Sequence, residues 1–398
     1  MTNHKILLTK LVFLIILLFS SVACISQKSG KSNVADKWSV RMANTVIAQS
    51  DSLIHYVQGS PKWAYDVAFL GMAIDRLGKV DPKYSKYMEN WVNYFIHPDG
   101  SVTDYRMKEY NLDRIFPGRN VIAVYKRNPD QKYKTALDNF IEQLKTHPKT
   151  NAGGYWHKNI YPWQMWLDGI FMASTYMAQY AKEFNAPEWF DMATFQTKLI
   201  YEKTLDPSTG LLMHAWDESR QQKWCDPATG QSHYPWSRAM GWYIMAIEDI
   251  LDNLPKDHPD RDALIKILQN CCDALLKVRD PKSGIWYQVL NQGSRDGNYL
   301  EGSGSAMYIY VFAKGARLGY LDKKYSDVAN TAFDGFLKEL VTVDEKGLVT
   351  IHNICGGCGL GGNPYRDGTY EYYINEKRFD NDTKGVAPFI LAAIELNR

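Results

Sequence analysis

Residues 166–181 read WLDGIFMASTYMAQYA, and residues 192–205, which follow shortly after, read MATFQTKLIYEKTL. The first stretch is apolar or small around nearly the whole circumference of a helix, whereas the second repeats its apolar residues at i, i+3, i+4 and i+7. A helix that is apolar all round is buried, and a helix with one apolar stripe lies outside and covers it. The two stretches therefore predict a hairpin of one inner and one outer helix.

The same pair of patterns recurs along the chain. Further stretches of the inner type begin near Trp63, Val121, Met240, Gly304 and Val386. All but the last are followed by an amphipathic helical pattern, and residues 38–58 are expected to supply the missing outer helix and close a ring. The sequence thus predicts an all-α fold, an (α/α)6 barrel of six hairpins, built as a single domain over residues 38–398.

Short turn motifs separate most outer helices from the next inner helix. DPSTG at 206–210 and DPKSG at 280–284 are typical of turns, and the few apolar residues after each fit a short extended stretch. These stretches lead back to the N-terminal ends of the inner helices. We therefore expect short β or extended loops at one mouth of the barrel, where the loops that carry His214, Trp216, Trp286 and His352 should gather.

The N-terminus is typical of an exported protein. Residues 1–24 contain two lysines, an apolar run from Leu11 to Phe19 that is too short to span a bilayer, and small residues at the end, as in a secretory signal peptide. Cys24 after a small residue also resembles a bacterial lipoprotein site, although Ser21 stands where leucine is usual. Residues 25–37 read as a polar tether. We expect a protein that is periplasmic, or attached to a bacterial membrane only through a lipid on Cys24.

The composition narrows the class of partner. The 398 residues are 45% hydrophobic and 23% charged with a net charge of +2, as in ordinary folded proteins. The sequence contains no block of Lys and Arg of the kind that binds a phosphate backbone, so no nucleic acid is expected as a partner. The 12 Trp and 26 Tyr offer flat surfaces on which sugars stack, although a large helical core also uses such residues. We expect a monomer.

Asp168 lies in the first turn of a predicted inner helix, surrounded by Trp163, Trp166 and Phe171. It is either a helix cap or a group that takes part in proton transfer. The helix N-terminus favours its charged form, whereas burial and a second carboxylate favour its protonated form. Asp113, in NLDRIFPGR before the second inner helix, is expected at the same mouth. Two carboxylates there suit acid/base chemistry on a sugar.

Other side chains are candidates for binding. His214 and Asp217 could act as base, orienting group or hydrogen-bond donor, or be structural. Arg238 and Trp242, four residues apart, share a helix face. A guanidinium with an indole suits a carboxylated sugar, although an arginine also packs on a tryptophan without binding anything.

Cys355 and Cys358 form a CGGC motif that reads as a redox pair, half a zinc site, or a glycine-rich turn. The turn is favoured because no second CxxC, no His-x-x-x-His and no strand–helix context accompany it. No phosphate-binding loop, nucleophile elbow or metal-ligand cluster is found in the sequence. We therefore predict neither a metal nor a cofactor.

Several long motifs resemble glycoside hydrolase family 105, the unsaturated rhamnogalacturonyl hydrolases. They are HPKTNAGGYWHKNIYPWQMWLDGIFMA, GLLMHAWDESRQQKWCDPATG, WSRAMGWY, and GLGGNPYRDGTYEYYINE followed by KGVAPFILAAIEL. The likeness runs in order from about residue 60 to the C-terminus. It implies an (α/α)6 barrel and a particular reaction.

That reaction is hydration of the C4=C5 vinyl ether of a 4,5-unsaturated uronic acid at the non-reducing end of an oligosaccharide released by a polysaccharide lyase. The resemblance implies that Asp168 is the general acid and base and that Asp113 is the second acidic residue. It assigns substrate binding to His157, Trp166, His214, Arg238 and Trp242 and, on shorter motifs, to Tyr65 and Arg366.

Three readings of the function remain open. The favoured one is hydrolysis of unsaturated galacturonyl-rhamnose, and an unsaturated glucuronyl hydrolase of the same mechanism is the nearest alternative. A glycan-binding protein without activity on the same barrel, or another barrel enzyme such as an ordinary exo-glycosidase or a sugar epimerase, would belong to a different class.

Overall fold

A computed structural model describes residue 34 and residues 37–57, 59–293 and 295–398. The chain divides into two compact units, Met1–Lys37 and Trp38–Arg398, and the second is described below. The predicted signal peptide and, apart from Val34 and Lys37, the predicted tether lie outside the described residues. In the part of the chain that the structure describes, no helix combines the length and apolar character needed to cross a bilayer.

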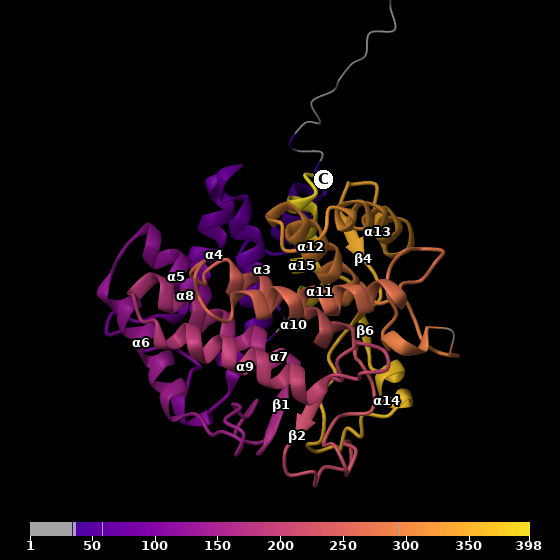
Figure 1. Ribbon diagram of the computed structural model, residues 1–398. Helices are drawn as coiled ribbons and strands as arrows, with labels where there is room; N and C mark the ends of the chain where they lie inside the picture. The colour runs from indigo at the N-terminus through magenta and orange to yellow at the C-terminus, as the bar shows by residue number, and fades with distance from the viewer. Residues whose placement is uncertain (1–33, 35–36, 58, 294) are drawn as a thin grey trace, which may run out of the picture. The chain divides into compact units, whose positions relative to one another are not determined.

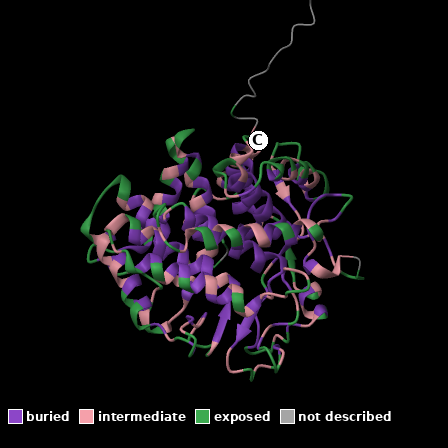
Figure 2. Ribbon diagram, viewed as in Figure 1, coloured by how far each residue is buried: buried purple, intermediate pink, exposed green. Residues whose placement is uncertain are grey.

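The inner layer of the barrel consists of helices that are buried on almost every side (Figure 2). α10 shows this most clearly, since each of its residues is buried. The inner helices are α3 (Tyr65–Asp75), α5 (Gly118–Arg127), the run of α7 (Leu167–Gly169), the π-helical turn η6 (Ile170–Ser174) and α8 (Thr175–Phe184), then α10 (Ser237–Leu251), α12 (Gly302–Leu318) and α15 (Thr383–Glu395).

The outer layer consists of amphipathic helices whose outward faces are exposed (Figure 2). They are α2 (Trp38–Gln49), α4 (Pro82–Phe95), α6 (Gln131–Thr146), α9 (Glu188–Thr204), α11 (Arg261–Lys277) and α13 (Lys324–Leu340). Side chains cap the starts of α4 and α6: Asp81 accepts a hydrogen bond from the Lys83 N–H with Pro82 in the first helical position, and Asp130 accepts from the Lys132 N–H.

Each outer helix packs against its inner partner, and neighbouring inner helices pack against one another (Figure 1). α15 contacts α3, and α2 contacts α15, so the ring closes through residues from both ends of the unit. The predicted (α/α)6 barrel is confirmed, and α2 supplies the sixth outer helix as expected.

The strands are short and occur only in two-stranded pairs within the described residues. β1 (Gln164–Trp166) pairs with β2 (Ala215–Asp217), β3 (Val341–Val343) with β4 (Val349–Ile351), and β5 (Ile354–Cys355) with β6 (Arg378–Phe379), all antiparallel. One helix outside the two layers, α14 (Tyr370–Asn375), lies between β5 and β6 in sequence. Short 3-10 turns complete the loops: η2 (Leu53–His55), η3 (Arg76–Lys79), η4 (Met107–Glu109), η5 (Leu112–Arg114) and η7 (Leu290–Gln292).

These loops meet the inner helices at their N-terminal ends. The Leu167 N–H donates to the His214 carbonyl at 3.1 Å, and the Glu301 N–H donates to the Trp286 carbonyl at 2.9 Å. The Gly302 N–H donates to the carbonyl of Asn353, the neighbour of His352, at 3.0 Å. The loops that start α7 and α12 therefore gather at one mouth, as the turn motifs predicted.

Half of the 12 tryptophans are fully buried. Trp286, for example, donates its indole N–H to the Leu275 carbonyl at 2.8 Å and packs edge-on against Tyr308. The fully buried ones are Trp63, Trp91, Trp224, Trp236, Trp242 and Trp286. For these residues the core explanation of the aromatic content holds.

Candidate active site

The pairing of β1 with β2 brings His214 beside Asp168. Trp166 lies opposite Ala215 in the two-stranded sheet, so the next residue on each strand, Leu167 and His214, remains in register. The His214 Nε2 atom consequently lies 3.6 Å from Asp168 Oδ2. His214 is fully buried, whereas the Asp168 side chain keeps 15% of its surface exposed. Asp168 is therefore the member of this pair that a ligand can reach.

Asp168 is not a helix cap. The cap position of α7 is held by Trp166, and no side chain makes a capping bond there. Asp168 Oδ2 is buried and has no hydrogen-bond partner among the described residues. The capping interpretation is wrong, because the carboxylate points toward His214 instead of the helix amides. The π-helical turn η6 begins two residues later, and such turns are frequent at functional sites.

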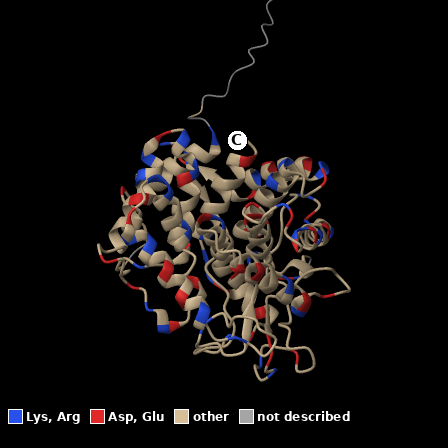
Figure 3. Ribbon diagram, turned by 60° about the vertical axis from the view of Figure 1, so that its left-hand side comes forward, with Lys and Arg blue, Asp and Glu red and all other residues tan. Residues whose placement is uncertain are grey.

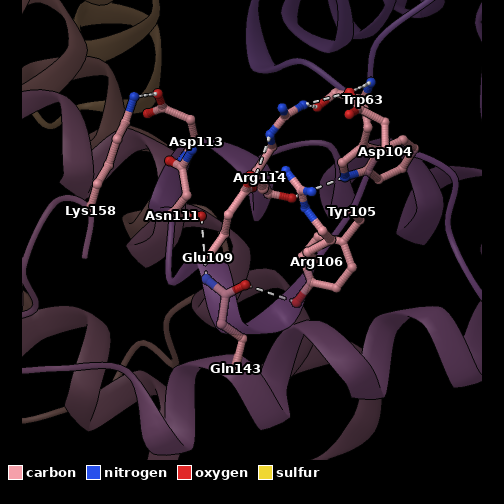
Figure 4. Close-up of polar contacts among 10 residues, drawn as sticks. All are labelled: Trp63, Asp104, Tyr105, Arg106, Glu109, Asn111, Asp113, Arg114, Gln143 and Lys158. Carbon is pink, nitrogen blue, oxygen red and sulfur yellow. Dashed lines mark hydrogen bonds and ion pairs between the residues drawn. The ribbon is translucent and has the colours of Figure 1, made fainter. Parts of the chain in front are cut away.

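Asp113 is held by a cation. Lys158 Nζ lies 2.6 Å from Asp113 Oδ2, and His157 Nε2 lies 3.4 Å from Oδ1 (Figure 4 shows Lys158). Burial raises the pKa of Asp113, but the charge of Lys158, together with His157, outweighs burial and holds the pKa below its ordinary value. Asp113 is thus a carboxylate at neutral pH.

A polar scaffold fixes the segment that carries Asp113 (Figure 4). The Asn111 side chain caps η5 by accepting from the Asp113 N–H at 3.0 Å, and Gln143 donates to the Asn111 carbonyl at 3.3 Å. Arg114, next in sequence, turns away from Asp113 and pairs with Asp104 at 3.0 Å. Lys158 is therefore the cation in direct contact with Asp113.

His157 contacts Asp113 and packs against Trp166. Its ring is buried and stacks on Trp166, with centroids 4.7 Å apart and planes at 12°. Trp166 also stacks on Tyr161 at 4.8 Å and meets His214 edge-on at 5.6 Å. Burial lowers the pKa of His157 to about 4, against a smaller opposing effect of both carboxylates. His157 is thus a neutral imidazole that interacts with the carboxylates of Asp113 and Asp168. Trp166 packs against the rings of both His157 and His214.

A pH dependence of stability follows from the buried histidines. Burial lowers the pKa of His147, like that of His157, to about 4. An unfolded chain binds a proton on each below about pH 6.5, whereas the folded chain does so only near pH 4. The unfolding free energy should therefore fall as pH decreases from 6.5 to about 4, by up to about 3 kcal/mol for each histidine.

Urea unfolding at several pH values measures this slope. His147→Gln keeps a donor for the Trp156 carbonyl, which His147 Nε2 contacts at 2.8 Å, and should reduce the slope. The same substitution at His97, which is exposed, should leave the slope unchanged. A wild-type unfolding free energy that is constant over this range would contradict the assignment of neutral, buried imidazoles.

Arg238 is buried and bonded at one end. Its Nη1 donates to Ser303 Oγ at 3.1 Å and to the Cys355 carbonyl, and Nη2 makes no hydrogen bond within the described residues. The guanidinium lies over Trp236 at 4.6 Å. The arginine thus packs on a tryptophan, but not on Trp242, which the spacing of four had suggested.

Trp242 is buried in a cluster of aromatic rings. It packs against Phe69 at 5.0 Å and Phe171 at 4.8 Å, and Tyr65 meets it edge-on at 6.2 Å. Burial, followed by the charges of Asp113 and Asp66, raises the pKa of Tyr65 well above its ordinary value, so the phenol remains a donor. Tyr65 and Asp113 also line a depression of about 250 Å³, together with Lys62, Ala64, Asp66, Asn111, Arg114 and Lys158.

Two other candidates hold loops. Asp217 is fully buried and accepts hydrogen bonds from the amides of Ser219, Gln221 and Gln222. It is structural and not a base, because its own loop folds around the carboxylate. Arg366 donates from Nε to the Gly361 carbonyl and from Nη2 to the Tyr161 hydroxyl, both at 2.8 Å, so it ties its loop to the rim.

Cys355 and Cys358 lie in the loop that contacts Arg238. Both thiols are buried and free, with their sulfur atoms 3.5 Å apart. Among the residues that the structure describes, no group of three or more His, Cys, Asp or Glu side chains could hold a metal ion. The glycine-rich turn is the arrangement observed.

Two residues of the site were missed by the sequence analysis. Lys158 follows His157 directly in the WHK motif, and this adjacency could have identified it as a residue of the site. Tyr373, whose hydroxyl lies 2.9 Å from His214 Nδ1, gave no local signal, since 159 residues separate the two.

Comparisons with known proteins bear on this arrangement. The sequence profile of Glycosyl Hydrolase Family 88 matches residues 38–398. A solved glycoside hydrolase from family 105 of C. acetobutylicum ATCC 824 is 42% identical with a TM-score of 0.87, covering 91% of this chain and 99% of its own. Protein Atu3128 of Agrobacterium fabrum is 35% identical over 233 residues, 56% of this chain and 97% of its own length. The unsaturated rhamnogalacturonyl hydrolase YesR of Bacillus subtilis is 25% identical over 250 residues, 61% of this chain and 67% of its own length.

Proposed function

The chain is a glycosidase that belongs to Glycosyl Hydrolase Family 88 and resembles a family 105 enzyme at 42% identity, and we propose that it hydrolyses lyase-generated oligosaccharides with a 4,5-unsaturated uronic acid at the non-reducing end. The proposed preferred substrate is unsaturated galacturonyl-rhamnose. The observation that carries the proposal is a pair of carboxylates with different surroundings: Asp113 is paired with Lys158, whereas Asp168 Oδ2 has no hydrogen-bond partner in the described part of the chain.

In the proposed mechanism Asp168 is the general acid and base. It delivers its proton to C4 of the vinyl ether, and positive charge develops at C5 and the ring oxygen. The carboxylate of Asp113 stabilises that charge. A water molecule adds to C5 and returns a proton to Asp168, and the resulting hemiketal opens and expels the remaining sugar. Because no displacement occurs at C1, the carboxylate spacing that separates retaining from inverting glycosidases does not apply.

Binding of the unsaturated sugar is proposed to use donors at the mouth. Arg238 Nη2 is available for the uronate carboxylate, since Nη1 is already bonded to the protein. The protonated phenol of Tyr65 donates to a sugar hydroxyl above Trp242. His157, His214 and Trp166 shape the wall around the two acids, and Arg366 holds the adjacent loop.

An unsaturated glucuronyl hydrolase remains the second candidate. Glucuronic and galacturonic acid differ only at C4, and the double bond removes the configuration at C4. The unsaturated sugar is therefore the same from either source, and the candidates differ in the linkage and in the leaving sugar.

A single assay tests the proposal. Lyase digests of rhamnogalacturonan and of a glycosaminoglycan are supplied to the purified protein, and the ultraviolet absorbance of the conjugated double bond is followed. Loss of absorbance with the rhamnogalacturonan digest is expected, with no release of sugar from saturated oligosaccharides. Hydrolysis of the saturated oligosaccharides would instead indicate an ordinary exo-glycosidase, and binding without turnover of any digest would indicate a glycan-binding protein.

We also propose that the protein is exported and that Cys24 carries a lipid. The support is the sequence of residues 1–24 alone. Fractionation of the producing cells, with Cys24→Ala as the comparison, separates a lipid-anchored protein from a free periplasmic one.

A further inference from the structure

The hydroxyl of Tyr373 is bonded to the histidine that faces Asp168. Tyr373 in α14 and His214 before β2 are both fully buried. The hydroxyl lies 2.9 Å from His214 Nδ1, and it has no second hydrogen-bond partner within the described residues. On the other side of the same ring, Nε2 lies 3.6 Å from Asp168 Oδ2. The three groups form a chain from α14 to the candidate acid.

In the neutral form of His214 this contact can be made in two ways, because the ring then carries its proton on one nitrogen only. If the Tyr373 O–H donates to Nδ1, the ring proton is on Nε2 and faces the Asp168 carboxylate. If instead Nδ1–H donates to the phenol oxygen, the buried O–H has no acceptor, and the lone pair on Nε2 faces the carboxylate. A buried hydroxyl without an acceptor is costly, so the first arrangement is favoured.

The surroundings support a Tyr373 that keeps its proton. Burial, more than the nearby Cys358, Tyr372 and Asp168, raises the pKa of Tyr373 well above its ordinary value. The other rings against His214 are Trp166, at 5.6 Å, and Trp236, at 4.8 Å, neither of which carries a charge. The charge of Cys355 raises the pKa of Tyr373 as well, and the neighbouring His157 is neutral because burial lowers its pKa to about 4.

We propose that Tyr373 is a positioning residue that fixes His214 in its Nε2–H tautomer. The Nε2–H group then faces Asp168 while Asp168 protonates the substrate. The inference rests on the proposed function. When the proton leaves Asp168 for C4, negative charge develops on Oδ2. A donor that already points at this oxygen stabilises the charge without reorganisation, whereas a lone pair would oppose it. No proton passes through Tyr373 or His214 in this step.

Tyr373→Phe removes only the hydroxyl. We expect kcat to fall on the order of ten- to hundredfold, with KM nearly unchanged, because the histidine ring becomes free to take either tautomer. The matched control is Tyr372→Phe in the same helix, whose hydroxyl accepts from the Gly359 N–H at 3.1 Å and does not touch His214. The control should keep its kcat. An unchanged kcat in Tyr373→Phe, with the melting temperature of the wild type, would overturn the inference.

Nitrogen NMR of the histidine-labelled protein provides a readout that needs no substrate. The signal of His214 is assigned by its loss in His214→Gln. A protonated Nε2 and an unprotonated Nδ1 are expected in the wild type, with a mixture of tautomers in Tyr373→Phe. A wild-type protein with the proton on Nδ1 would refute the inference. If no unsaturated oligosaccharide is turned over, the proposed function fails, and the spectrum still decides the tautomer.

Discussion

Replacing Asp168 by asparagine is expected to reduce kcat on an unsaturated disaccharide by about a thousandfold or more, with the fold intact. General acid/base catalysis contributes roughly 10²–10⁴ to such reactions, and an amide of the same shape cannot supply the proton. Folding should be unaffected because Oδ2 has no hydrogen-bond partner within the described residues. Initial rates by absorbance and a thermal melt measure the two quantities separately.

The matched control is Asp217→Asn. This aspartate is buried nearby, but its oxygens accept three backbone hydrogen bonds. Its substitution is expected to lower the melting temperature and to leave kcat of the folded fraction close to that of the wild type. If Asp168→Asn retains a substantial fraction of the wild-type kcat, Asp168 is not the general acid.

Replacing Arg238 by lysine is expected to raise KM by about ten- to hundredfold, since a charge-assisted hydrogen bond is worth roughly 1.5–3 kcal/mol. In the proposed complex the guanidinium has two tasks: Nη1 donates to Ser303 and to the Cys355 carbonyl, and Nη2 is assigned to the uronate carboxylate. A lysine keeps the charge but is a single point donor, so it cannot do both.

Two comparisons make this prediction specific. On a substrate whose uronate is a methyl ester, the wild type and Arg238→Lys should have similar KM values, because the charged partner is gone. Arg366→Lys changes an arginine that is bonded to its own loop, and it should alter KM little. An equal rise in KM on the acid and on the ester would exclude a contact between Arg238 and the carboxylate.

The fold could be derived from the sequence because its signals are local. The spacing of apolar residues within a helix determines its burial pattern. It shows that α10 is buried all round and that α4 has a single apolar stripe. The same holds for the turns: Gly210 has φ +77° after DPST, and Asp206 accepts from the Ser208 N–H. The position of Asp168 in the first turn of an inner helix follows from these local signals.

The partners of the polar side chains could not be derived in this way. Arg238 packs on Trp236 and not on Trp242, and Asp217 turns into its own loop. Lys158 reaches Asp113 because Leu112 donates its N–H to the His157 carbonyl, a register that neither segment shows alone. The periodic pattern contains no information on such pairings.

The sequence by itself thus determined the ring of helical hairpins and which residues lie at its mouth. Only the tertiary structure decided which partners these residues have: Asp168 Oδ2 has no hydrogen-bond partner among the residues described, Asp113 is paired with Lys158, and His214 lies against the hydroxyl of Tyr373. The physical reason is the separation along the sequence over which each kind of interaction acts. Burial periodicity acts over one helical turn, whereas a hydrogen bond between residues 159 positions apart depends on how every intervening element packs.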